Sequence, residues 1–218
     1  MTQAVVLFGS PGSGKGTQAN LLKDCLKVPH ISTGDMLREH IREGNTLGVR
    51  VAATMQSGNL VRDEVVNRLV TERLAKPDAQ AGFILDGYPR TLEQGEHLVG
   101  WLDARGIREL VIHLIVDYNI IVTRLTGRRQ CPRCATLYNI VSSPPRVEGV
   151  CDLDGQALVI RDDDRESVIR ERLAAYESQT RPLIEFFLEK GRRLFEIDAG
   201  SRTPEALLSQ VCGSIKSV

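Results

Sequence analysis

The stretch VVLFGSPGSGKGT, residues 5–17, decides the fold of this 218-residue chain. A short apolar run leads into the pattern G-x-x-x-x-G-K, and a helical pattern follows directly. The glycines allow the backbone to wrap an anion with its N–H groups, while the helix N-terminus adds partial positive charge. A chance lysine in a glycine-rich turn is the alternative, but the strand–loop–helix context favours a phosphate-binding loop. The predicted ligand contacts there are Gly12, Ser13, Gly14, Lys15, Gly16 and Thr17.

Four more short apolar runs follow this loop, and helical patterns lie between them. Such alternation predicts an α/β fold with a five-stranded parallel sheet covered by helices on both faces. The predicted strands are Ala4–Phe8, Val28–Ile31, Gly82–Leu85, Leu110–Val116 and Leu194–Ile197. The predicted helices are Lys15–Leu26, Val65–Leu74, Leu92–Arg105 and Val168–Lys190.

Two segments depart from this alternation and read as inserts. Residues 32–61 have a helical pattern, whereas residues 127–165 are rich in Gly, Pro, Ser, Cys and charges without a long helical period. We therefore expect a core domain of residues 1–31, 62–126 and 166–218, a helical insert at 32–61 and a strand- or loop-rich module at 127–165.

Composition excludes several function classes. The 28 basic residues balance 28 acidic ones, so no overall field attracts nucleic acid or an anionic membrane. No apolar run approaches the roughly 18 residues of a membrane span. The N-terminus lacks the basic region of a signal peptide. These features predict a cytoplasmic protein with reduced thiols and no membrane or nucleic-acid partner.

The chemistry is expected at the strand exits, because ligands of open parallel sheets bind beyond the carboxyl ends of the strands. These exits read GSPGSGKGT, STGDMLR, DGYPRT, DYNIIVTRLTGRR and DAGSR. Turn formation explains their glycines and aspartates but not their repeated arginines. The pattern therefore predicts an anionic ligand at this edge of the sheet.

Three cysteines and an aspartate form the spacing C-x₂-C-x₁₆-C-x₂-D, at Cys131, Cys134, Cys151 and Asp154. This set supplies four tetrahedral ligands with no open position, as a structural zinc site requires. A disulfide, a thioredoxin-like redox pair and a plain Asp-Gly turn are the alternatives; the reducing compartment and the matched second pair disfavour them. A 39-residue insert cannot build a sufficient core, so a metal would replace one. The remaining cysteines, Cys25 and Cys212, are expected in the apolar core.

Five further motifs make a family resemblance specific: HISTGDMLR (30–38), GFILDGYPRTLEQ (82–94), GRRQCPRC (127–134), RDDDRESVIRERL (161–173) and YESQTRPL (176–183). With the loop at 9–17, the chain resembles long-form bacterial adenylate kinases with a zinc-bearing lid, over nearly its whole length. The resemblance implies reversible phosphoryl transfer from MgATP to AMP, giving two ADP and serving adenine nucleotide homeostasis. It also implies a monomer that uses Mg²⁺ and one structural Zn²⁺, with residues 32–61 as AMP-binding insert and 127–165 as lid.

The resemblance assigns roles to individual residues. The implied AMP site comprises Thr33, Arg38, Asn59, Leu60, Val61, Gly87, Tyr88, Pro89, Arg90, Gln94, Arg161 and Arg172. The implied ATP site adds Arg124, Arg128, Leu137, Tyr138 and Arg202 to the loop residues 12–17. The implied catalytic residues are Lys15, Arg38, Asp86, Arg90, Arg128, Arg161 and Arg172.

The chemistry of these residue types agrees with the roles. Arg38 and Arg90 offer forked donors suited to a phosphate. Thr33 and Gln94 offer hydrogen-bonding groups for an adenine edge. Asp86 would organise the waters of Mg²⁺, and a simple turn residue is its alternative.

Other positions are less specific. Asp35 would help the metal indirectly or else cap the following helix. Arg129, Arg165 and Arg170 are assigned to a solvated helix face.

Three positions depart from the expected patterns. Gly16 stands where phosphate-binding loops generally carry a metal-ligating Ser or Thr, a variant that the resembled family shares, with Mg²⁺ held largely by water and nucleotide oxygens. Tyr88 replaces a Phe that is usual in that family, and we expect its stacking to be preserved. Arg62 replaces a frequent Pro and changes the charge at the end of the insert.

Other functions are compatible with the same sequence. A near variant would use UMP or CMP as acceptor, or GTP as donor. A different class is a zinc-ribbon protein that binds nucleic acid and uses ATP as a switch; neutral charge and 5% aromatic residues disfavour it. A switch GTPase is disfavoured because no N-K-x-D signature is present.

Overall fold

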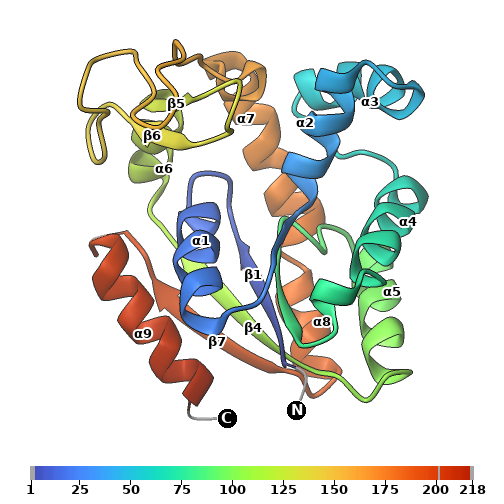
Figure 1. Cartoon of the computed structure of the whole chain (residues 1–218). Helices are drawn as coiled ribbons and strands as arrows, with labels where there is room; N and C mark the ends of the chain where they lie inside the picture. Colours follow the sequence, from blue (N-terminus) through green and yellow to red (C-terminus); the bar gives the residue numbers. More distant parts are fainter. Residues whose placement is uncertain (1–2, 201, 217–218) are drawn as a thin grey trace.

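A five-stranded sheet of strand order β2-β3-β1-β4-β7, parallel throughout, lies at the centre of the molecule (Figure 1). The computed structural model describes residues 3–200 and 202–216. Strand β1 pairs with β3 on one side and β4 on the other, so that Val5 lies opposite both Ile84 and Leu110. The strands are β1 (Gln3–Gly9), β2 (His30–Ser32), β3 (Gly82–Asp86), β4 (Arg108–Ile115) and β7 (Arg193–Asp198).

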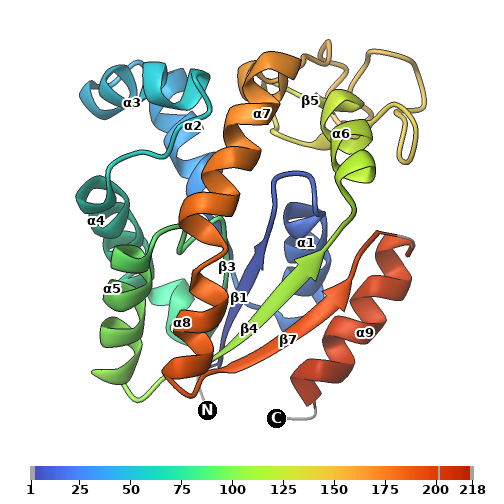
Figure 2. The ribbon, with the colours of Figure 1, turned by 180° about the vertical axis from the view of Figure 1, so that it is seen from behind.

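Alternation along the strands divides the core into two apolar clusters. On β1, Ala4 and Phe8 face one cluster, whereas Val5 and Leu7 face the other. The first is completed by α4 (Asp63–Leu74), α5 (Leu92–Asp103) and α8 (Leu183–Glu189). The second is completed by α1 (Lys15–Leu26) and α9 (Pro204–Lys216). The two groups of helices lie on opposite sides of the sheet (Figures 1 and 2), as predicted for this fold class.

Both inserts lie beyond the carboxyl ends of the strands (Figure 1). Residues 32–61 form α2 (Thr33–Glu43) and α3 (Thr46–Gln56). The other insert follows α6 (Tyr118–Thr126) and contains β5 (Arg128–Gln130), β6 (Leu137–Asn139) and the short η2 (Asp162–Asp164). The antiparallel pair β5–β6 forms its own small sheet. A further short helical turn, η1 (Pro77–Ala79), precedes β3.

One predicted helix is interrupted. The pattern predicted a continuous helix over Val168–Lys190, but the structure has α7 (Glu166–Ala175), a π-helical segment η3 (Tyr176–Thr180) and α8. Pro182 explains the break, because it has no N–H to donate and crowds the preceding turn. In η3 the Arg181 N–H donates to the Tyr176 carbonyl at 2.8 Å, which is an i to i+5 bond. Helices α6 and α9 were not predicted.

The two isolated cysteines differ from expectation. Cys25 is exposed on α1, because Ala19 and Leu22 on another side of that helix face the core. Cys212 on α9 is only partly buried against the second cluster. Within residues 3–200 and 202–216, no helix has the length and apolar character needed to cross a membrane.

Candidate active site and metal cluster

The loop between β1 and α1 has the geometry of an anion cradle. Helix α1 begins after Gly14, and its first turn carries neither a side-chain cap nor an acidic residue. Its N–H groups therefore face the loop without competition. Gly12 has φ of +81°, and a Cβ there would lie 3.0 Å from the Leu125 side chain of α6. The close approach of loop and α6 thus requires glycine at this position.

Lys15 is held at the centre of this loop. Its Nζ donates to the carbonyl oxygens of Gly9 at 2.6 Å and Ser10 at 2.8 Å, and to Ser13 Oγ at 3.3 Å. Burial lowers the pKa of Lys15 to about 7, with neighbouring arginines adding to the effect and Asp86 opposing it. This lysine is therefore poised to gain an anionic partner.

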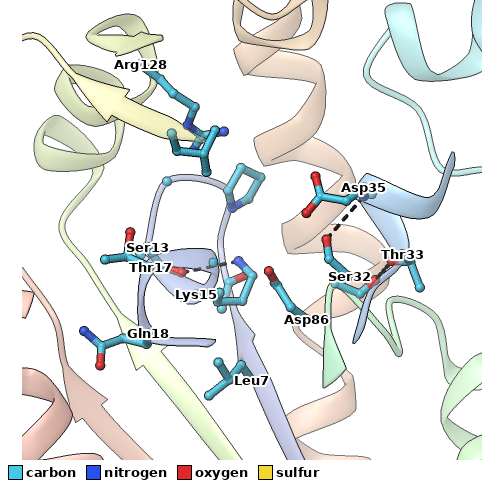
Figure 3. A pocket seen from close by; sticks show the side chains of 18 of the residues that line it. Leu7, Ser13, Lys15, Thr17, Gln18, Ser32, Thr33, Asp35, Asp86 and Arg128 are labelled. Atoms are coloured by element: carbon cyan, nitrogen blue, oxygen red, sulfur yellow. Dashed lines mark hydrogen bonds between the residues drawn. The ribbon is translucent and has the colours of Figure 1, made fainter. Parts of the chain in front are cut away.

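Asp86, at the end of β3, lies beside Lys15 (Figure 3). Burial works to raise its pKa, but the His30 imidazole, 3.3 Å from Oδ2, and the charge of Lys15 hold the pKa below its usual value. A Cβ at Gly16 would lie 3.4 Å from Asp86 Oδ2, so glycine keeps the space beside this carboxylate clear. An ionised carboxylate with open space beside it fits a hydrated divalent cation.

Basic side chains from separate segments converge on one cavity of about 780 Å³. Among the described residues, eight lysine or arginine side chains line it against three carboxylates. Burial, together with Arg172, lowers the pKa of Arg90 to about 10, and burial, together with Arg38, lowers the pKa of Arg161 to about 9. A cavity lined by so many crowded positive charges favours the binding of a polyanion between them. The eight are Lys15, Arg38, Arg90, Arg124, Arg128, Arg161, Arg172 and Arg202.

Aspartates that sequence reasoning left without a role position these arginines. Asp164 is 2% exposed, and its Oδ1 accepts from Arg172 at 2.8 Å and from Arg128 at 3.4 Å. Asp163 lies 3.3 Å from Arg172 and 3.8 Å from Arg38. The run of three aspartates after Arg161 was the available signal.

The two inserts meet across the cavity. Asp35 on α2 pairs with Arg38 at 2.7 Å and lies 3.5 Å from Arg161 of the other insert. Asp35 does not cap α2; Ser32 Oγ is the cap and accepts from the Asp35 N–H at 3.2 Å (Figure 3). Arg161 is fixed further by donation from Nε to Gln130 Oε1 at 2.7 Å.

The loop after β3 is anchored from several elements. The Gly87 carbonyl accepts from Thr33 Oγ1 at 2.7 Å and from Arg90 Nε at 2.8 Å. The Arg90 carbonyl accepts from Thr180 Oγ1 at 2.8 Å. Thr180 was missed by sequence reasoning because its segment was predicted as uninterrupted helix.

Every residue of the predicted nucleotide and catalytic sets lines the cavity, with one exception. Tyr88 is only 1% exposed, packs in the first apolar cluster, and donates its hydroxyl to Asn67 Oδ1 at 2.7 Å. The Tyr88 ring therefore belongs to the core and does not line the cavity, and a buried partner satisfies its hydroxyl.

On the other side of the cavity, α6 and the loop after β7 approach each other. Arg124 Nη2 donates to the carbonyls of Ala199 at 2.8 Å and Gly200 at 3.2 Å. Arg202 lines the same region. Leu137 and Tyr138 contribute from β6, although the Tyr138 hydroxyl lies 3.6 Å from Cys151 Sγ and thus reaches the cysteine cluster.

The predicted ligand set is assembled in the insert. One ligand atom from each of Cys131, Cys134, Cys151 and Asp154 lies within 4.8 Å of the others. Cys134 Sγ and Cys151 Sγ are 3.6 Å apart, and Cys131 Sγ is 3.4 Å from the Asp154 carboxylate. A tetrahedral ion with ligand bonds of about 2.3 Å to sulfur and about 2.0 Å to oxygen would separate these pairs by about 3.8 and 3.5 Å. The cluster thus fits a tetrahedral metal ion.

Comparison with known proteins agrees with the geometry. The sequence profile of the adenylate kinase family matches residues 7–192. The chain belongs to the adenylate kinase family. It is 44% identical over 206 residues to the adenylate kinase of Anaeromyxobacter dehalogenans strain 2CP-1, covering 94% of this chain and 95% of that protein. It is 46% identical over 206 residues to the adenylate kinase of Moorella thermoacetica, covering 94% of this chain and 94% of that protein. It is 48% identical over 188 residues to the adenylate kinase of Oceanobacillus iheyensis, covering 86% of this chain and 87% of that protein.

Family membership defines the reaction class. The chain is a nucleotide-binding kinase that transfers the terminal phosphoryl group of MgATP to AMP and gives two ADP. The cavity has the charge that this reaction requires, because it brings together two polyanionic nucleotides.

Proposed function

We propose that Lys15 and the arginines at 38, 90, 128, 161 and 172 bind the two nucleotides end to end and neutralise the phosphoryl group in transit. The observation that carries this proposal is the convergence of these six side chains on one cavity, between the loop at residues 9–17 and the loop after β3. Phosphoryl transfer needs positioning and charge neutralisation more than covalent chemistry, and this arrangement supplies both.

We assign the ATP side to the loop at 12–17 and to Arg124, Leu137, Tyr138 and Arg202. The anion cradle would receive the β- and γ-phosphates, with Lys15 giving up its loop carbonyls for phosphate oxygens. Adenine would lie between α6 and the loop after β7, where Arg124 bonds that loop.

We assign the AMP side to Thr33, residues 59–61, Gly87, Pro89, Arg90 and Gln94. Arg38 and Arg90 would bind the α-phosphate, with Arg161 and Arg172 reaching it from the other insert. The apolar side chains that line this end of the cavity suit a base: Leu37, Met55, Leu60, Val61 and Val66.

Bound together with ATP, Mg²⁺ would supply charge neutralisation for the transferring phosphates. Asp86 is the residue that would orient its waters, and the ionised carboxylate with clear space at Gly16 supports this role.

We propose three moving parts: the core of residues 1–31, 62–126 and 166–218, the AMP insert 32–61, and the lid 127–165. The Asp35–Arg161 and Arg38–Asp163 pairs join the two inserts over the cavity and support a closed arrangement that excludes water. Water exclusion matters because water would otherwise accept the phosphoryl group.

We propose that the cysteine cluster holds one structural Zn²⁺. The four protein ligands would fill all positions of a tetrahedral ion, which supports structural rather than catalytic use. The three thiols imply a reducing compartment, and we propose a cytoplasmic monomer.

The function is tested by mixing the protein with MgATP and each nucleoside monophosphate in turn and following diphosphate formation. We expect rapid turnover with AMP and slow turnover with GMP, CMP and UMP. Preference for UMP or CMP would identify a relative with another acceptor, and ATP hydrolysis stimulated by nucleic acid would favour the switch class.

A further inference from the structure

Gln94 has its amide fixed on both sides by groups of opposite hydrogen-bonding character. Its Nε2 donates to Asp63 Oδ1 at 2.7 Å, and its Oε1 accepts from the Arg90 N–H at 2.8 Å. A carboxylate only accepts and a backbone N–H only donates, so the reversed amide would oppose two donors at one end and two acceptors at the other. Gln94 is 2% exposed and lines the cavity.

Asp63 is the anchor of this arrangement. It occupies the first position of α4, and its second oxygen, Oδ2, accepts from Thr91 Oγ1 at 2.9 Å. Thr91 in turn accepts from the Gln94 N–H at 3.2 Å and caps α5. Both carboxylate oxygens of Asp63 thus accept hydrogen bonds from the segment that carries Gln94. Asp63 itself is not among the described residues that line the cavity.

The Gln94 amide retains one free hydrogen-bond donor and one free acceptor for a ligand. One Nε2–H and one Oε1 lone pair are not used by Asp63 and Arg90. Because the Gln94 amide is fixed, the positions of its free N–H donor and its free carbonyl lone pair are fixed as well. They can pair with a base edge that presents an acceptor and a donor in the matching order, but not with an edge that presents them in the reverse order. A 6-aminopurine presents a ring-nitrogen acceptor beside an amino donor, whereas a 6-oxopurine presents a ring N–H donor beside a carbonyl acceptor.

We propose that Asp63 is a specificity-determining positioning residue: through Gln94 it sets the polarity with which the acceptor site reads the purine edge, selecting 6-amino over 6-oxo monophosphates. The inference rests on the proposed placement of the acceptor base beside Gln94. Without Asp63 the amide loses its acceptor-only neighbour, and its reversal no longer opposes two acceptors at that end.

The test compares AMP with IMP, two purine monophosphates that differ at this edge, in the Asp63→Ala variant. We expect kcat/KM for AMP relative to IMP to fall about tenfold, in line with loss of one charge-assisted hydrogen bond, while KM for MgATP stays at its wild-type value. Asp63→Asn keeps one acceptor and should restore part of the ratio. If Asp63→Ala does not fold, Asp63→Leu carries the test, because it removes both acceptors and keeps a similar side-chain volume; an unchanged ratio in that folded variant overturns the proposal.

Two control variants separate this role from general loosening. Glu64→Ala removes the adjacent carboxylate, whose side chain is 68% exposed and pairs only with Arg62 among the described contacts, and should match wild type. Tyr88→Phe removes the hydroxyl bond to Asn67 from the same loop; it should lower the thermal midpoint without changing the AMP-to-IMP ratio.

The outcomes are distinct. An unchanged ratio in folded Asp63→Ala, or an equal fall in Tyr88→Phe, overturns the positioning role of Asp63. Wild-type protein that makes no ADP from AMP contradicts the proposed function instead.

Discussion

The sheet core and the lid, residues 127–165, are stabilised by different means. The apolar side chains of the central strands β1 and β3 are only 0 to 3% exposed and belong to two large apolar clusters, for example Val6 and Phe8 in the first of them. The lid has one small cluster of Cys131, Tyr138 and Cys151, with Leu158 packed against it. Two of those three buried residues are candidate metal ligands. The lid does not lack apolar side chains, since Ile140, Val141, Val147, Leu153, Val159 and Ile160 are all exposed. It lacks a geometry that buries them.

This difference supports the proposal that the core is stabilised by its own apolar packing, whereas the order of residues 127–165 depends on a bound metal. Burial stabilises the core cooperatively, whereas four ligand atoms can order the lid locally. A metal-ordered segment of this kind would be able to move as one body, as proposed above for residues 127–165.

Removal of the metal should have the largest effect, because it should disorder the lid and leave the core folded. Chelation, or Cys151→Ser, should abolish protection of lid amides from hydrogen exchange, because structural metal binding supplies about 10 kcal/mol or more to such small modules. Core amides on β1 and β4 should keep their protection. Cys25→Ser is the matched control, since that thiol is exposed on α1 and outside the cluster. Equal loss of protection in core and lid, or absence of zinc by elemental analysis, would contradict the assignment.

Removal of an active-site charge should lower the activity and leave the core stable. Lys15→Met should lower kcat by about a thousandfold, the scale of a lost phosphate-neutralising donor. The fold should not suffer: the pKa of Lys15 lies below the ordinary 10.5, so the unfolded chain binds more protons between pH 7 and 10.5. The lysine therefore costs stability below pH 7, and this cost fades as pH rises through that window.

The measurement for Lys15→Met is a thermal midpoint at pH 6 and pH 9 beside a turnover assay. We expect a midpoint equal to or above wild type at pH 6. A large drop at pH 6 with activity retained would show that the loop was misinterpreted.

A matched pair of truncations sharpens the contrast in packing. Leu22→Ala in the second apolar cluster removes a side chain with 0% exposure and should cost about 2–5 kcal/mol in the free energy of unfolding. Leu158→Ala in the lid should cost about 1 kcal/mol or less, because that side chain is only partly buried beside a small cluster. Denaturant titration of both variants measures the costs. Similar values would mean that the lid is packed like the core.

The same division explains what sequence could predict. The strands, the phosphate loop and the cysteine spacing are local patterns, and each was predicted close to its observed position. The π-helical segment at Tyr176–Thr180 was not predicted, because it depends on Pro182 and on tertiary contacts such as the hydrogen bond from Thr180 Oγ1 to the Arg90 carbonyl. The ring of Tyr88 was expected in the site and lies in the core, and Asp63 was missed, for a related reason: tertiary packing decides whether a side chain points into the cavity, the core or a neighbouring helix.

The smallest effect concerns a single proton at Lys15. With its pKa near 7, the side chain is mostly uncharged at pH 8 and mostly charged at pH 6. A triphosphate beside it favours the ammonium form and raises the pKa, so MgATP binding should take up as much as about one proton at pH 8 and much less at pH 6. Calorimetric titration in two buffers of different ionisation enthalpy measures this uptake directly. Lys15→Arg, which keeps a cation that does not titrate in this range, should lose the uptake at pH 8. The absence of proton uptake at pH 8 would mean that Lys15 is already charged before the nucleotide binds.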